Sequence, residues 1–98
     1  LVVLTGGAHA GVVNTINQAR AVVGDKPVRA VMGGFHLGFT TTPHENVGLT
    51  VDALKDLGVQ TIMPMHCSGV RTHAHLAHDK HYVQPAVGTV LQFGKPQP

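Results

Sequence analysis

The segment LVVLTGGAH (residues 1–9) is the most informative about the fold, because an uninterrupted apolar run ends in two glycines and a histidine follows almost at once. A short apolar run of this kind is typical of a buried strand. The arrangement recurs in VRAVMGGFH (28–36) and in VQTIMPMH (59–66), so that the histidines lie 27 and 30 residues apart. This interval is about the length of one strand-plus-helix unit. The sequence therefore predicts three strands that are joined by helices.

Helical patterns fill both intervals. Apolar residues at helical spacing predict the first helix over residues 10–23. The second helix is predicted to begin at a capping box formed by Thr42 and Glu45, with Pro43 in the first helical position, and to end at Gly58. Alternation of strands and helices favours a parallel sheet with right-handed crossovers.

The last third of the chain carries weaker patterns. Residues 68–78 are predicted to form a short helix, and residues 82–84 and 87–93 two final strands. The expected order is β-α-β-α-β-α-β-β, an α/β fold with a mostly parallel sheet. We expect residues 1–98 to form a single domain, because this length suffices for one small core.

Three histidines follow the three predicted parallel strands. Ligands of such sheets bind beyond the carboxyl ends of the strands, which lie side by side. We therefore expect His9, His36 and His66 to converge. Neutral imidazole binds Zn, Fe, Ni or Cu well, so the pattern predicts a metal site. The alternative for any one of them is a partly buried histidine that bonds to a carbonyl group.

Other metal-binding side chains are weaker candidates. Cys67 directly follows His66 and is a soft ligand as a thiolate, but a single cysteine is more often a small packing residue. A second group of histidines lies at positions 73, 75, 78 and 81. We interpret these four as solvent-exposed side chains, with adventitious metal binding as the alternative.

Four motifs, in order, carry a family resemblance: TGGAHAGVVNT (5–15), VMGGFHLG (31–38), IMPMHCSG (62–69) and VGTVLQF (87–93). Together they resemble the C-terminal half of metallo-β-lactamase-fold proteins. The branch they resemble is that of metal-dependent hydrolases related to the dihydropterin-ribofuranosyl-aminobenzene phosphate synthases. This resemblance implies half of an αββα sandwich with helices packed on one face of the sheet.

The resemblance also implies roles for the three histidines. The fold holds two metals, usually Zn and sometimes Fe or Mn. His9 would complete the first metal site and His66 the second. His36 falls where many relatives carry a bridging Asp or a Cys, which makes it a third ligand, a substrate contact or a proton donor, and hence the candidate catalytic residue.

Two departures from the family pattern affect these expectations. The signature HxHxDH, which supplies most ligands in the family, does not occur in this sequence, and we expect it to belong to an N-terminal half that this chain lacks. Gly7 stands where related proteins often carry a cysteine. We therefore expect part of a dinuclear zinc hydrolase that acts on an unknown small molecule and is inactive alone. The alternative is a non-catalytic metal-binding or dimerising interaction module.

The composition of the chain argues for or against the remaining classes of protein, such as nucleic-acid binders and membrane proteins. Charged residues make up only 12% of the chain and the net charge is +2, with the basic residues scattered, which argues against a nucleic-acid binder. The single cysteine fits a reducing compartment, and neither a signal peptide nor a membrane span is recognisable, so we expect a cytoplasmic protein without membrane contact. Because the predicted strands are apolar throughout, we expect the exposed face of the sheet to be buried against another protein surface. That surface would come from a second copy of the chain, in a homodimer, or from a complementary N-terminal half.

Overall fold

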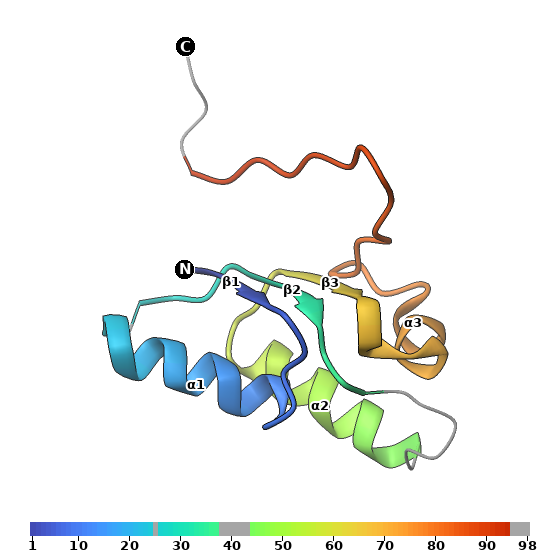
Figure 1. Ribbon diagram of the computed structural model, residues 1–98, viewed down its shortest axis with the longest axis horizontal. Coiled ribbons are helices and arrows are strands. Elements are labelled where there is room, and N and C mark those ends of the chain that lie inside the picture. Colours follow the sequence, from blue (N-terminus) through green and yellow to red (C-terminus); the bar gives the residue numbers. More distant parts are fainter. Residues whose placement is uncertain (25, 38–43, 95–98) are drawn as a thin grey trace.

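The computed structural model describes residues 1–24, 26–37 and 44–94. Along the chain the elements are β1 (Val2–Thr5), α1 (Val12–Val23), β2 (Ala30–Gly34), α2 (His44–Asp56), β3 (Thr61–Met65), the 3-10 turn η1 (His66–Ser68) and α3 (Val70–Leu76). The three α-helices lie on one face of the sheet, and the C-terminal segment crosses the other face (Figure 1). The predicted α/β class and the helices on one face are confirmed.

The sheet is parallel throughout and has the strand order β1-β2-β3. In the register, Val3 pairs with Val31 and Val31 with Ile62. This row faces the helices, and all three side chains are buried. The helices contribute Ile16, Leu54 and Leu76 to the same core, each with no exposed surface. Each such side chain contributes roughly 1.5–3 kcal/mol by leaving water.

The glycine pair after the second apolar run belongs to the strand itself, since β2 begins at Ala30 and continues through Gly33 and Gly34. A Cβ atom on Gly33 would lie 1.9 Å from the carbonyl oxygen of Thr5, and its φ is +121°. A Cβ atom on Gly34 would lie 2.3 Å from the carbonyl oxygen of Gly6. Only glycine allows the ends of β1 and β2 to approach this closely.

The predictions for the last third of the chain are partly wrong. The predicted helix 68–78 is shorter, because Gly69, with φ +79°, separates η1 from α3. The two final strands do not form ladders within the described residues; Tyr82 makes a single bridge to Ile62, and 87–93 has no strand partner. A strand without a neighbour to pair with has no ladder to stabilise it.

Thr42 and Pro43, which the sequence assigns to the start of the second helix, lie outside the described residues. The helix itself is present from His44 to Asp56. In the described part of the chain, no helix has the length and apolar character that crossing a membrane requires.

We expect Gly33→Ala to lower the free energy of unfolding by at least about 3 kcal/mol, because the new methyl group meets backbone and the φ angle is unfavourable. Gly58→Ala is the matched control, since Gly58 has φ +84° but no atom of the described part of the chain lies within 4 Å of its added Cβ atom. The control should lose only about 1 kcal/mol. Urea denaturation of both variants measures the difference, and equal losses would contradict the close approach of β1 and β2.

Candidate metal centre

The three sequence-predicted histidines all follow carboxyl ends of strands at one edge of the sheet. His9 lies four residues after β1, His36 two residues after β2, and His66 directly after β3. The backbone is unusual at this edge: among the described residues, the non-glycine residues with positive φ are Ala8 at 44°, His36 at 50° and His66 at 55°. Such conformations cost about 1–3 kcal/mol each and concentrate at functional sites.

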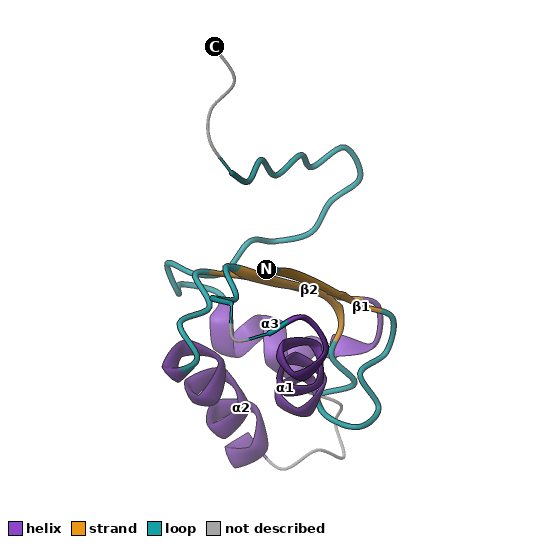
Figure 2. Ribbon diagram, turned by 90° about the vertical axis from the view of Figure 1, so that its left-hand side faces the viewer, coloured by secondary structure: helices purple, strands orange, loops and turns teal. Residues whose placement is uncertain are grey.

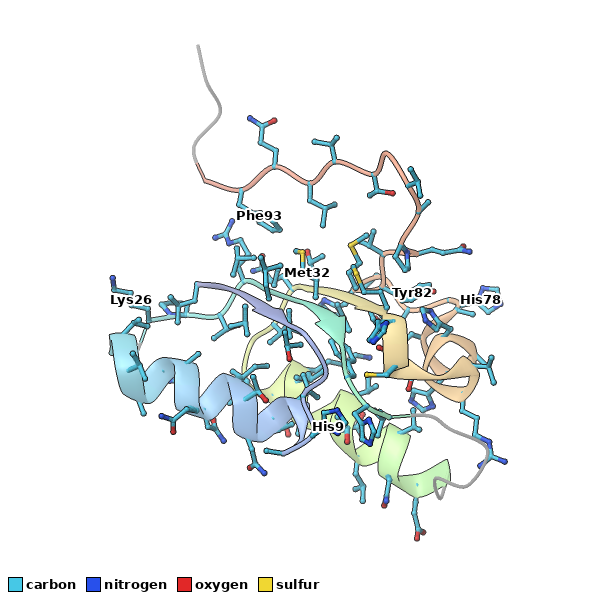
Figure 3. The ribbon with its side chains drawn as sticks, in the orientation of Figure 1. His9, Lys26, Met32, His78, Tyr82 and Phe93 are labelled. Carbon is cyan, nitrogen blue, oxygen red and sulfur yellow. The ribbon has the colours of Figure 1, made fainter. Side chains whose placement is uncertain are left out.

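The structure brings two of these histidines together. The ring centroids of His9 and His36 are 4.1 Å apart, and the ring planes are tilted by 36°. Both side chains are exposed, so the pair faces solvent. His9 is labelled in Figure 3, on the loop that follows β1. Two adjacent imidazoles from different loops are a donor pair for a transition metal.

A tight turn fixes His9. The backbone N–H of Gly11 donates to the carbonyl oxygen of Ala8 at 2.8 Å, directly before α1 begins. The imidazole folds back over Gly7, where a Cβ atom would lie 3.0 Å from His9 Cδ2. Gly7, which stands where related proteins often carry a cysteine, therefore affects the local structure. A cysteine side chain at this position would press on the His9 ring.

His36 is fixed by its two neighbours in the chain. Phe35 is buried, and its N–H donates to Ser68 Oγ at 3.1 Å. The N–H of Leu37 donates to the carbonyl oxygen of Cys67 at 3.3 Å. Because both flanking residues are bonded to the loop after β3, the loop with His36 and the loop with His66 form one unit.

Ser68 is a site-supporting residue that sequence reasoning missed. It is fully buried, accepts the bond from Phe35 and lies 2.8 Å from the carbonyl oxygen of Met65, to which its hydroxyl donates. It thereby links the exits of β2 and β3. Its place two residues after His66, in the quoted motif IMPMHCSG, was the signal in the sequence that could have found it.

The structure does not assemble a complete metal site. Across the described ranges, no three His, Cys, Asp or Glu side chains are gathered closely enough to hold a metal ion. His66 is exposed at the same edge of the sheet but forms no such group with His9 and His36. The metal roles of the three histidines and the catalytic role of His36 stay predictions.

The side chain of Cys67 packs beneath the loops at the carboxyl edge of the sheet and does not lie on the exposed edge with the histidines. Its thiol donates to the carbonyl oxygen of Gly7 at 3.6 Å, and its sulfur would lie 2.8 Å from a Cβ atom on Gly34. The side chain is half-buried. Cys67 thus packs between the exits of β1 and β2, as a small packing residue does.

The second group of histidines is split between two structural contacts and two exposed side chains. His73 Nδ1 lies 2.7 Å from the hydroxyl of Tyr82, and His81 Nδ1 donates to the carbonyl oxygen of Gln60 at 2.9 Å. His75 and His78 are exposed. Burial raises the pKa of Tyr82, so this phenol stays protonated as a partner of His73.

Asp79 joins the same turn to α2. Its carboxylate accepts from Lys55 and from the backbone N–H of His81. The hydrogen bond from Lys55, followed by that from His81, lowers the pKa of Asp79. This turn therefore has a structural role on the far side of β3 from β2.

Comparisons with known proteins agree with this architecture. A metal-dependent hydrolase of the beta-lactamase superfamily, Tm1679, superposes with a TM-score of 0.80 at 28% identity, over 96% of this chain and 36% of that one. No family model matches the chain. The chain thus has the fold of one part of a metallo-β-lactamase superfamily hydrolase, which confirms the resemblance drawn from the four motifs.

Two curated relatives indicate which branch of the superfamily the chain resembles. The chain is 37% identical over 71 residues to the 7,8-dihydropterin-6-methyl-4-(beta-D-ribofuranosyl)-aminobenzene-5'-phosphate synthase of Methanocaldococcus jannaschii, which covers 72% of this chain and 24% of the synthase. An uncharacterized protein of the same organism is 29% identical over 90 residues, 92% of this chain and 33% of that protein. The chain therefore spans about a quarter to a third of the curated relatives it matches.

The fully buried hydroxyl groups of Ser68 and Thr72 allow a test of the hydrogen bond that supports the loop with His36. We expect Ser68→Ala to destabilise the fold by about 1–3 kcal/mol, because the N–H of Phe35 loses its buried partner. Thr72→Val is the control: Thr72 is equally buried, but its Oγ1 has no hydrogen-bond partner among the described residues. The control should be neutral or slightly stabilising. Thermal unfolding measures the stability of both variants. An unchanged stability of Ser68→Ala would contradict the supporting role of this hydroxyl.

Proposed function

We propose that this chain supplies His9, His36 and His66 to the metal site of a hydrolase of the metallo-β-lactamase superfamily. The observation that carries the proposal is the contact between His9 and His36, whose ring centroids are 4.1 Å apart at the carboxyl edge of the parallel sheet. The similarity to a metal-dependent hydrolase over 96% of the chain supports it.

The donor chemistry fits a transition metal, but the ligand set is incomplete. Zinc in proteins takes three or four protein ligands, of which His9 and His36 would be two. His66 is the third candidate, on the loop that Ser68 and Phe35 tie to the loop with His36. The remaining ligands would come from outside this chain, since it spans only 36% of the similar hydrolase. We propose zinc as the metal, with iron or manganese as alternatives.

The chain's own residues would hold and orient the metal. When bound, the metal would act as a Lewis acid on the substrate. His9 and His36 would bind it through neutral imidazole nitrogens; the alternative role for His36, on its constrained loop, is contact with the substrate. Because protons compete with the metal for the imidazole nitrogens, metal binding should weaken in acid.

The reaction that we propose is hydrolysis of a small molecule. One relative is a synthase and the solved relative is a hydrolase, so the substrate depends on parts of the active site that differ among them. In the described part of the chain no carboxylate accompanies the histidine pair as a further ligand. We therefore propose that the 98-residue chain alone binds metal without catalysing hydrolysis. This observation also favours the second candidate function, a non-catalytic metal-binding module.

Metal content of the untagged chain tests the proposal. After zinc loading and dialysis, we expect about one ion per chain by mass spectrometry, and a strong loss in His9→Ala, His36→Ala and the double variant His9→Ala/His66→Ala. His75→Ala is the control, because His75 is an exposed histidine on α3 and should leave the zinc content unchanged.

Equal zinc content in wild type and in His9→Ala/His66→Ala would show that the ligand assignment is wrong. Assays with generic phosphoesters and esters then test whether the zinc-loaded chain has any hydrolytic activity by itself. Hydrolysis by the zinc-loaded chain alone would contradict the proposal that other parts of the active site are required.

A further inference from the structure

Cys67 contacts both of the loops that carry the paired histidines. Its thiol donates to the carbonyl oxygen of Gly7, two residues before His9, at 3.6 Å. Its own carbonyl oxygen accepts from the N–H of Leu37, the residue after His36, at 3.3 Å. Figure 2 shows β1 and β2 ending at the same side of the sheet, where the loops after them begin. One residue therefore joins two loops that are far apart in the sequence.

The contact of the thiol with Gly7 reaches the ring of His9. A Cβ atom on Gly7 would lie 3.0 Å from His9 Cδ2, so the imidazole lies against the backbone of this glycine. The thiol of Cys67 holds the carbonyl group of the same glycine. A displacement of Gly7 would therefore move the His9 ring relative to the ring of His36, whose centroid is 4.1 Å away.

The sulfur of Cys67 also fills a specific space. It would lie 2.8 Å from a Cβ atom on Gly34, so the absence of a side chain at the end of β2 makes room for it. A thiol is only a weak hydrogen-bond donor, and the volume of the sulfur is therefore the larger part of its effect. Because protein interiors are densely packed, removal of the sulfur leaves a gap toward which the loop with Gly7 can relax.

We propose that Cys67 is a positioning residue that sets the separation of the His9 and His36 rings and thereby the affinity of the pair for a metal ion. The consequence for metal binding rests on the function proposed above, whereas the effect on the ring separation does not. Groups that orient metal ligands without touching the metal change its affinity by about 10–100-fold when they are replaced.

Nuclear magnetic resonance of the metal-free, isotope-labelled 98-residue chain tests the positioning role. The wild type should give a nuclear Overhauser effect between ring protons of His9 and His36, because the rings are in contact. In Cys67→Ala this signal should be weakened or lost. Ile62→Val is the control: Ile62 is fully buried in β3, so the variant loses stability, but the signal between the rings should persist.

Zinc affinity, measured by competition with a chelator, tests the consequence for metal binding. Cys67→Ala should bind zinc about tenfold more weakly than the wild type. Cys67→Ser should lose less, because a hydroxyl group can still donate to the carbonyl oxygen of Gly7. Ile62→Val should bind zinc as the wild type does. Circular dichroism checks the fold of each variant, and should Cys67→Ala fail to fold, Cys67→Ser is expected to show a weakened signal between the rings.

The inference is overturned if Cys67→Ala folds and keeps the full signal between the rings. Zinc affinity equal to that of a zinc-binding wild type would overturn it too. A cobalt(II)-loaded wild type with a thiolate charge-transfer band in the near ultraviolet would show that Cys67 is a ligand and not a positioning residue. A wild type that binds no zinc would contradict the proposed function, while the signal between the rings would still decide the positioning role.

Discussion

The close approach of the ends of β1 and β2 determines how the loops of the candidate site are arranged. Gly33 and Gly34 leave space for the carbonyl oxygens of Thr5 and Gly6, and any side chain there would collide with backbone. Because the two strands end side by side, the loops after them lie in contact, and His9 meets His36. The glycines that allow β1 and β2 to pair closely therefore also bring the two histidines of the candidate site together.

The loop after β3 is joined to the loop after β2 by hydrogen bonds rather than by a close contact at glycine. Ser68 receives the N–H of Phe35, and the carbonyl oxygen of Cys67 receives the N–H of Leu37. These bonds hold His36 at φ 50°, a conformation that an unconstrained histidine would leave. Burial of the Phe35 side chain and the hydrogen bond from its N–H to Ser68 offset the cost of this conformation.

Sequence reasoning predicted the parallel sheet because strand and helix periods are distinct over residues 1–65. It placed three histidines at one edge for the same topological reason. It could not predict which rings make contact, because loop conformation depends on tertiary bonds such as that from Phe35 to Ser68. It wrongly assigned ladders to the last strands, since a period-two pattern in residues 87–93 shows a strand-like segment but not its partner.

We propose that the paired imidazoles of His9 and His36 bind a metal ion. A crystal of the untagged chain grown with zinc, and measured on both sides of the zinc absorption edge, tests it most directly. We predict an anomalous peak about 2.1 Å from one nitrogen of each ring. A well-ordered pair without a peak, or a peak only among the histidines of α3 and the turn after it, would contradict the claim.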